Sequence, residues 1–524
     1  MNVSFTQSAE DIKSETASYD TVVVPVFKGG ELGQEGTALN KELRELLEDQ
    51  IALRNGFGKT AGDIRPIDGS ENTTPKRFVL VATGQAYDPS TACDAGQGKA
   101  VAAALYKHLT AVNAGKTYIA QDFDHAFTND FSVTLADELN AADYAFDKYK
   151  SKAAASKPLD LHFAVADTEA ATQDYTKRAA VTEAQKWAKD LTNEPPNKLY
   201  PAVYAEQIIQ KLAPLGVKVS VIEDEELVKM GAGAISAVGQ GSPKSHKPRM
   251  VIMEYDGTAG NDADAAPLGL IGKGVTFDTG GISLKPSGSI ADMHMDMGGS
   301  AMIVGTMMAL AGRQAQSKVV AIVGLSDNDI GPDAYKPGDI ITSLSGQTIH
   351  VGNTDAEGRL VMADCMTYLQ QNYKPHTIVD AATLTGAVHS IFGHTYAGVF
   401  TNDDTVWSTL ETAGKTSGEQ GWRLPLHEVF NNAVKHNRAD LSNIGGIRFG
   451  GGSTAAEFLH HFIEKDENGK ETPWAHIDIA GAAMPPGGMA NGFGVRMLDQ
   501  WIADNYEESA TATHAQAPSA PKLS

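Results

Sequence analysis

Four acidic residues stand beside glycines or turns in separate parts of the sequence, and together they suggest chemistry. They are Asp278, Asp296, Asp355 and Glu357. Glycine lets the backbone turn sharply and approach a ligand closely, so carboxylates on such loops can be aimed at one point. Asp355 and Glu357 are two residues apart in what we expect to be an extended segment, which would project both side chains to the same side.

Carboxylates that gather in one cleft repel one another, and divalent cations are the natural compensation for that repulsion. The 15 histidines form no H-E-x-x-H motif, so a zinc site built on two helical histidines is unsupported. Oxygen-rich ligation instead suits a pair of metals bridged by shared carboxylates. Lys273 could join such a site as a neutral amine, because burial and two cations would lower its pKa.

Simpler interpretations exist for each residue alone. Asp278 could belong to a turn, Asp296 could cap the helix that follows it, Asp355 could form an Asx-turn, and Glu357 could be a first-turn charge. Exposed lysines such as Lys273 and Lys285 are usually solvated. These separate explanations become improbable when all of the residues are considered jointly. The pair His460-His461 lies in a helical pattern and is interpreted as a surface pair, not as a ligand.

The glycine-rich stretch from Ile271 to Gly288 does not predict a nucleotide site. It follows an apolar strand that begins at Leu268, and we expect it to form a turn. A phosphate-binding loop needs G-x-x-x-x-G-K-[ST], and neither Lys273 nor Lys285 has that context.

The elements expected around these residues alternate between strands and helices. Near the N-terminus, the sequence predicts strands at 21–27, 78–84, 117–123 and 159–166, and helices from Lys99 to Val112 and from Arg178 to Leu191. Further along, it predicts strands at 217–222, 250–255, 268–272, 319–324, 376–380 and 395–400, and helices at 299–313, 357–373 and 454–464. Sites in such folds gather at the carboxyl ends of the strands.

This alternation predicts an α/β protein with a smaller N-terminal α/β domain, joined by a helix to a larger α/β catalytic domain with a mostly parallel, mixed sheet covered by helices. The expected boundaries are 1–170 for the N-terminal domain, 171–194 for the linker helix and 195–507 for the catalytic domain. Residues 508–524 are rich in Ala, Thr, Ser and Pro and are expected to be disordered.

Composition excludes several classes of protein. The net charge of −22 repels phosphate backbones and anionic membranes, so nucleic acid is an unlikely partner. Two cysteines, Cys93 and Cys365, are too few for a disulfide scaffold. The N-terminal stretch has no apolar signal region, and no run is long and apolar enough to span a membrane. We therefore expect a cytoplasmic protein with no membrane association.

The sequence resembles the cytosolic leucine aminopeptidases, a family of di-metal hexameric exopeptidases. The segments that carry the resemblance occur in the family's order and cover roughly residues 170–500, whereas residues 1–150 match only in class. These segments are GKGVTFDTGGISLK (272–285), DMGGSA (296–301), NTDAEGRL (353–360), DAATLTGA (380–387), RLPL (423–426), STAAEFL (453–459) and WAHIDIAG (474–481). A visible departure is Thr279, where serine is common, and it does not bear on activity.

The resemblance implies a role for individual residues. It implies that Asp278, Asp355 and Glu357 hold one metal, and that Lys273, Asp278, Asp296 and Glu357 hold the other, tighter one. It further implies that Lys285 and Arg359 are the catalytic pair, with Lys285 beside the scissile carbonyl and Arg359 holding a bicarbonate that serves as general base. The residues that fall where the family lines its substrate pocket are Met293, Thr383, Leu384, Gly386 and Ala480.

The activity that follows is hydrolysis of the N-terminal residue from peptides, with leucine and other apolar first residues preferred. A hydroxide that bridges two divalent ions would attack the carbonyl. If the substrate's free α-amine binds one metal, only the first residue of a peptide can place its carbonyl correctly. The resemblance implies Zn²⁺ or Mn²⁺, with Mg²⁺ or Co²⁺ possible, and a homohexamer built as a dimer of trimers.

Two other functions remain open from the sequence. Some members of this family have a second role in recombination or transcription, so the chain could be a DNA-binding accessory protein, although its net charge argues against that role. A di-metal phosphoesterase would use similar ligands. Cleavage of an aminoacyl-arylamide but not of a phosphoester separates the peptidase from the phosphoesterase.

Overall fold

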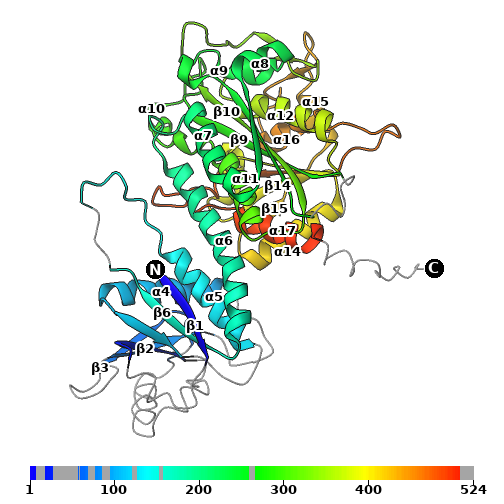
Figure 1. Cartoon of the computed structure of the whole chain (residues 1–524). Helices are drawn as coiled ribbons and strands as arrows, with labels where there is room; N and C mark the ends of the chain where they lie inside the picture. The colour runs from blue at the N-terminus through cyan, green and yellow to red at the C-terminus, as the bar shows by residue number, and fades with distance from the viewer. Residues whose placement is uncertain are drawn as a thin grey trace. The chain divides into compact units, whose positions relative to one another are not determined.

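The computed structural model divides the 524-residue chain into two compact units, Met1–Thr182 and Glu183–Ser524 (Figure 1). The residues that it describes are 1–7, 18–26, 57, 59–68, 77–84, 95–120, 127–152, 157–258 and 266–507. Cys93 and the expected disordered tail at 508–524 lie outside these ranges. No helix among the described residues has the length and hydropathy needed to cross a bilayer.

The first unit contains a six-stranded sheet in the order β1-β6-β5-β2-β4-β3. All neighbouring strands are parallel except β3 and β4. The strands are β1 Asn2–Gln7, β2 Thr21–Val26, β3 Ile64–Asp68, β4 Arg77–Ala82, β5 Lys116–Ile119 and β6 Asp160–Val165. The helices before α6 within the described residues are α4 Ala95–Ala111 and α5 Phe127–Ala142. The sequence predicted β2, β4, β5, β6 and α4 but missed β1, β3 and α5. Residues 121–123 of the expected strand 117–123 are not described.

Helix α6, Thr168–Asn193, is longer than the helix expected from Arg178 to Leu191. It ends just before Pro195 and Pro196, which cannot continue a helix. The division between the two compact units falls inside it, after Thr182. The domain boundaries proposed from the sequence remain a prediction.

The second unit contains an eight-stranded mixed sheet in the order β15-β14-β17-β13-β9-β10-β8-β7. The central strands β17, β13, β9 and β10 are parallel, whereas β14 is antiparallel to β17 and β8 is antiparallel to β10. The strands are β7 Lys218–Glu223, β8 Arg249–Asp256, β9 Leu268–Asp278, β10 Lys318–Asn328, β13 Thr377–Ala382, β14 Ala397–Thr401, β15 Gly421–Arg423 and β17 Trp474–Asp478. The predicted α/β class, with a mostly parallel sheet, is confirmed.

Helices lie on both faces of this sheet (Figure 1). They are α7 Pro201–Leu212, α8 Asp224–Met230, α9 Gly233–Gly239, α10 Ser287–Ile290, α11 Gly298–Gly312, α12 Gly358–Tyr373, α13 Gly386–Phe392, α14 Asp404–Ser417, α15 Glu428–Ala433, α16 Gly451–His460 and α17 Val495–Tyr506. A separate three-stranded sheet is formed by β11 Ile340–Thr342, β12 Thr348–His350 and β16 Leu441–Ser442.

The turn expected directly after residue 272 was wrong, because β9 continues to Asp278. Gly272 and Gly274 suggested a turn, but they serve close packing inside the sheet. A Cβ at Gly272 would lie 2.6 Å from the Cα of Ser300 on α11, and one at Gly274 would lie 2.6 Å from the carbonyl oxygen of Gly324 on β10. Lys273 therefore sits in a buried strand, paired with Gly324, and not on a loop.

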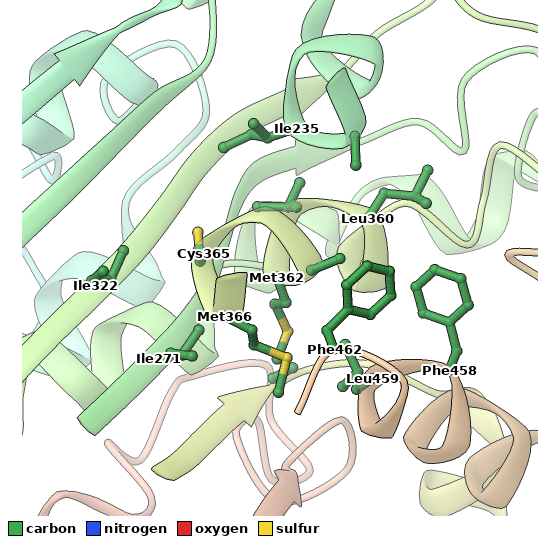
Figure 2. Packing of buried hydrophobic residues seen from close by; sticks show 14 of the residues in the cluster. Ile235, Ile271, Ile322, Leu360, Met362, Cys365, Met366, Phe458, Leu459 and Phe462 are labelled. Carbon is green, nitrogen blue, oxygen red and sulfur yellow. The ribbon is translucent and has the colours of Figure 1, made fainter. Parts of the chain in front are cut away.

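The hydrophobic core on one face of the sheet is organised by α12. Leu360, Met362 and Met366 extend from this helix toward its neighbours (Figure 2). Ile271 on β9 and Ile322 on β10 contribute from the sheet, and Phe458 and Leu459 contribute from α16. All of these side chains are buried, so α12 is held in place by the burial of apolar surface on several sides.

Asp364 on α12 anchors two neighbouring segments. Its Oδ2 accepts hydrogen bonds from the backbone N–H groups of Ala234 and Ile235 at the start of α9, both at 2.9 Å. Its Oδ1 accepts one from the N–H of Leu344 at 2.8 Å. Burial nevertheless raises the pKa of the Asp364 carboxyl to about 7. This side chain satisfies two buried donors and one partly buried donor.

We predict that Asp364→Ala lowers the free energy of unfolding by about 3 kcal/mol, because it leaves two buried N–H groups and one partly buried N–H group without an acceptor. Chemical denaturation followed by circular dichroism measures the change. The matched control is Asp333→Ala, which removes an exposed carboxylate from a loop and should change stability little. Equal stability of the two variants would contradict the anchoring role.

Candidate functional site

Strand β9 places two of the expected site residues at the carboxyl end of the sheet. Lys273 is almost fully buried, and its Nζ lies 2.8 Å from both Asp296 Oδ1 and Glu357 Oε1. It also donates to the carbonyl oxygen of Thr383 at 3.1 Å. Gly358 makes this position possible, because a Cβ there would lie 2.5 Å from the Lys273 Cε. One ammonium group is thus enclosed by two carboxylates.

Asp278 ends β9 and forms the second cluster of contacts. Its Oδ2 lies 2.8 Å from the Nζ of Lys285, and that Nζ also lies 2.6 Å from Asp355 Oδ1. Asp278 Oδ1 accepts hydrogen bonds from Asn328 Nδ2 at 2.7 Å and from the N–H of Gly280 at 2.8 Å. These donors fix the orientation of the Asp278 carboxylate.

The loop between Asp278 and Lys285 returns toward β9. The N–H of Lys285 donates to the carbonyl oxygen of Thr279 at 3.0 Å. Gly280 has a φ of 85°, in the left-handed region that favours glycine, and a Cβ there would lie 2.8 Å from Asp355 Oδ1. The glycine therefore allows the loop to pass directly beside a carboxylate.

The segment that carries Asp355 and Glu357 is a turn before α12, and not the extended segment expected from the sequence. Asn353 Oδ1 accepts the N–H of Asp355 at 2.8 Å, which closes an Asx-type turn. Asn443 Oδ1 accepts the N–H of Gly352 at 2.8 Å and holds the segment from outside. The expected convergence is still present, because ligand oxygens of Asp278, Asp355 and Glu357 all lie within 4.8 Å of one another.

Asp296 is placed by the turn that precedes α11. It does not cap that helix, whose N-cap is Met297. Its Oδ1 accepts from Thr383 Oγ1 at 2.8 Å as well as from Lys273. Its Oδ2 is buried and has no hydrogen-bond partner. A buried carboxylate oxygen without a partner is costly, so this atom is suited to an additional cation.

The electrostatics show that the lysines only partly compensate the carboxylates. Burial raises the pKa of Asp278 to about 6, and the charge of Glu357 adds to the effect. Burial also raises the pKa of Asp296 well above its usual value. Burial opposes ionisation of Glu357, but Lys273 and Lys285 together hold its pKa below the usual range. The pKa is thus raised for Asp278 and Asp296 and lowered for Glu357.

The two lysines respond in the opposite direction. Burial would lower the pKa of Lys273, but the charges of Asp296, Glu357 and Asp278 outweigh burial and raise it. The pKa of Lys285 is raised for the same reason, with Asp278 the largest of the charge effects. Lys273 is therefore an ammonium ion when it alone faces these carboxylates, and it would become a neutral ligand only with cations beside it.

Arg359, the second residue of α12, does not contact the carboxylates described above through any described hydrogen bond or ion pair. Its guanidinium is buried, and Nη1 donates to the carbonyl oxygen of Asn443 at 2.7 Å. Its Nε has no hydrogen-bond partner. Burial lowers the pKa of Arg359 to about 10. A cationic group with a free buried donor is suited to a small anion.

A cavity of about 330 Å³ collects most of the expected residues. Its lining includes the five expected ligands and Lys285, and also the five expected pocket residues Met293, Thr383, Leu384, Gly386 and Ala480. Arg359 does not line it. His389 does, although nothing in its sequence context marked it as a site residue.

Asp478 on β17 organises the far wall of this cavity. Its carboxylate accepts the N–H groups of Leu384, Thr385 and Ala480 at 3.0–3.1 Å, and the Thr385 hydroxyl at 2.7 Å. This one side chain joins the end of β13 to the end of β17. Sequence reasoning missed Asp478, and also missed Asn328 and Asn443. Each acts on another residue of the site through a long-range contact, which a single sequence does not reveal.

The donor set fits divalent cations. Four carboxylates and a buried lysine amine face one cavity, and one carboxylate oxygen lacks any partner. Oxygen-rich sites of this kind suit hard or borderline divalent ions. A second group, His246, Asp327 and Asp329, also has ligand atoms within 4.8 Å. There, the ion pair between His246 Nδ1 and Asp327 Oδ2 at 2.5 Å is sufficient to explain the grouping.

His460 and His461 were interpreted as a surface pair, and that description was wrong. Both side chains are partly buried. His460 Nε2 lies 2.8 Å from Glu471 Oε2, and its ring stacks on Trp474 at 5.3 Å. Neither histidine belongs to a group of metal-ligand geometry among the described residues.

Comparison with known proteins identifies the family. Residues 186–499 match the catalytic domain of the cytosol aminopeptidase family, and residues 23–153 match its N-terminal domain. A probable cytosol aminopeptidase of Chelativorans sp. is 39% identical over 501 residues, which cover 93% of this chain and 96% of the relative. One of Bradyrhizobium sp. is 40% identical over 489 residues, which cover 90% and 93%.

A solved structure shares the fold. The bottromycin maturation enzyme BotP in complex with Mn superimposes with a TM-score of 0.77 at 28% sequence identity, covering 93% of this chain and 99% of that one. The fold and both family matches point to the same family. The chain belongs to the cytosol aminopeptidase family and is an aminopeptidase, a hydrolase.

Proposed function

We propose that this aminopeptidase removes the N-terminal residue of peptides by metal-dependent hydrolysis, with leucine and other apolar first residues preferred. The observation that carries the proposal is the convergence of four carboxylates and two lysines on one cavity, with Asp296 Oδ2 left unpartnered. BotP, which shares this fold, was solved in complex with Mn, and that complex supports a divalent metal here.

Two divalent ions would be held by the residues of this cavity. Asp278, Asp355 and Glu357 would hold one ion, and the short distances between their carboxylate oxygens support their binding the same ion. Lys273, Asp278, Asp296 and Glu357 would hold the other, and the contacts of Lys273 with Asp296 and Glu357 support that grouping. Zn²⁺ or Mn²⁺ are the proposed ions, with Mg²⁺ or Co²⁺ possible. When bound, the ions would polarise the scissile carbonyl and lower the pKa of the attacking water.

Lys285 is proposed to stabilise the oxyanion that develops on the substrate. It lies on a loop at the cavity, beside Asp278 and Asp355, and its pKa is raised, so its ammonium group is charged at neutral pH. A fixed positive charge aimed at a developing oxyanion is typically worth about 3–4 kcal/mol.

Arg359 is proposed to hold a bicarbonate ion that acts as general base. The support is its unpartnered Nε and its backbone contact to Asn443, which fixes the guanidinium. Its absence from the cavity lining requires that the anion reach between Arg359 and the cavity. No other role of the site residues depends on this assignment.

The first side chain of the substrate is proposed to lie against Met293, Thr383, Leu384, Gly386 and Ala480. The backbone N–H groups of Leu384 and Ala480 are both bonded to the carboxylate of Asp478, which joins these two parts of the wall. A largely apolar wall favours leucine-like side chains. We further propose a cytoplasmic location and a homohexamer built as a dimer of trimers. The proposed domain boundaries are 1–170 for the N-terminal domain, 171–194 for the linker helix and 195–507 for the catalytic domain. Light scattering tests the oligomer.

We predict that Lys285→Ala lowers kcat by about 10²–10³-fold, because it removes a charge that stabilises the transition state. Metal content should persist, because Lys285 is not a proposed ligand. The measurements are leucyl-arylamide turnover and elemental analysis. Lys336→Ala, which removes an exposed lysine, is the control. Full turnover in the Lys285 variant would exclude the role.

Asp355→Ala should lose metal, because Asp355 supplies a ligand to one of the two ions. Elemental analysis after gel filtration is expected to find fewer than two ions per subunit, against two in the Asp333→Ala control. Retention of both ions would contradict the ligand assignment.

Removal of metal by a chelator should abolish hydrolysis of leucyl-arylamide, and Zn²⁺, Mn²⁺, Mg²⁺ or Co²⁺ should restore it to different extents. An aryl phosphoester tested in parallel should not be cleaved. Activity that survives complete metal removal, or cleavage of the phosphoester alone, would overturn the proposed reaction.

A further inference from the structure

The cavity is lined by an exposed histidine that the proposed function has not used. His389 lies on α13 and lines the same cavity as Leu384 and Ala480. It follows Gly386 by three residues, so both face the same side of that short helix. A Cβ at Gly386 would meet no atom within 4 Å, so the helix surface beside His389 is open.

The imidazole of His389 has a defined place. A Cβ at Gly481 would lie 3.1 Å from the His389 Cδ2, so the ring lies close to the backbone that follows Ala480. The ring of His394 lies beside it, with 4.8 Å between centroids. His394 is fixed by its Nδ1, which donates to the carbonyl oxygen of Gly481 at 2.9 Å. Two imidazoles thus stand together next to the apolar wall.

Both rings lack a carboxylate partner within the described parts of the chain. Neither His389 nor His394 forms an ion pair there, and the described contacts of the His389 ring are with the ring of His394 and the backbone near Gly481. The acidic residues of the cavity are instead in contact with Lys273 and Lys285. An imidazole carries at least one N–H donor in either protonation state. His389 is exposed to solvent, so its ring N–H can exchange water for a group that occupies the cavity.

We propose that His389 is a specificity-determining residue that admits N-terminal glutamate in addition to apolar first residues. Glutamate has an aliphatic stem that can lie along Leu384 and Ala480, and it ends in an acceptor that the imidazole can bind. The inference rests on the proposed function, because it places the first side chain of the substrate in this cavity.

The test compares kcat/KM for glutamyl- and leucyl-arylamide in the metal-loaded enzyme. The wild type should cleave both substrates. His389→Leu should lower the glutamyl-to-leucyl ratio by about tenfold, the effect of one hydrogen bond to a charged group. His389→Gln, which keeps a donor, should recover part of the ratio. The matched control is His294→Leu, a partly buried histidine next to Met293 that does not line the cavity, and it should leave the ratio unchanged.

The outcomes separate the inference from the function on which it rests. If the wild type cleaves leucyl- but not glutamyl-arylamide, or if His389→Leu leaves the ratio unchanged, the inference is overturned and the proposed function stands. An equal fall for both substrates also overturns it, because that result indicates general damage to the site. If the wild type cleaves neither substrate, the proposed function fails.

Discussion

The structure depends on one constraint, the repulsion among carboxylates that are gathered in the interior at the end of a sheet. Asp278, Asp296 and Glu357 are each almost fully buried. Lys273 contacts two of them and Lys285 contacts the third, yet the pKa of Asp296 remains well above its usual value because of burial. Buried, perturbed carboxylates of this kind are typical of functional sites, and the proposed binding of cations would compensate their repulsion.

The surrounding elements serve to hold these groups at fixed distances. Strand β9 supplies Lys273 and Asp278, and the turn before α12 supplies Asp355 and Glu357. Asn328 donates to the carboxylate of Asp278, and Asn443 holds the turn before α12. Asp478 holds the part of the cavity wall that contains Leu384. Most of these contacts join residues that are far apart in the sequence. The site is therefore a property of the folded unit and not of any one loop.

The sequence predicted the fold class, the central strands β9, β10 and β13 of the second unit and the convergence of the acidic residues, because apolar runs and glycine-flanked carboxylates are local signals. It failed where a local signal had a tertiary cause. Gly272 and Gly274 look like a turn, but they admit α11 and β10 to close approach. Strand β17 was missed because His476 and Asp478 interrupt its apolar pattern. Both are buried, and His476 is paired with Asp380 on β13 at 2.5 Å.

Helix α12 begins at the residue after Glu357 and continues into the middle of the hydrophobic core (Figure 2). One helix thus has one end at the cavity and one side in the hydrophobic core. Met362 and Phe458 belong to the cluster that packs around this helix, so their burial helps to fix where the helix begins and where Glu357 lies. The stability of the core and the placement of a cavity carboxylate are therefore coupled through apolar residues that do not line the cavity.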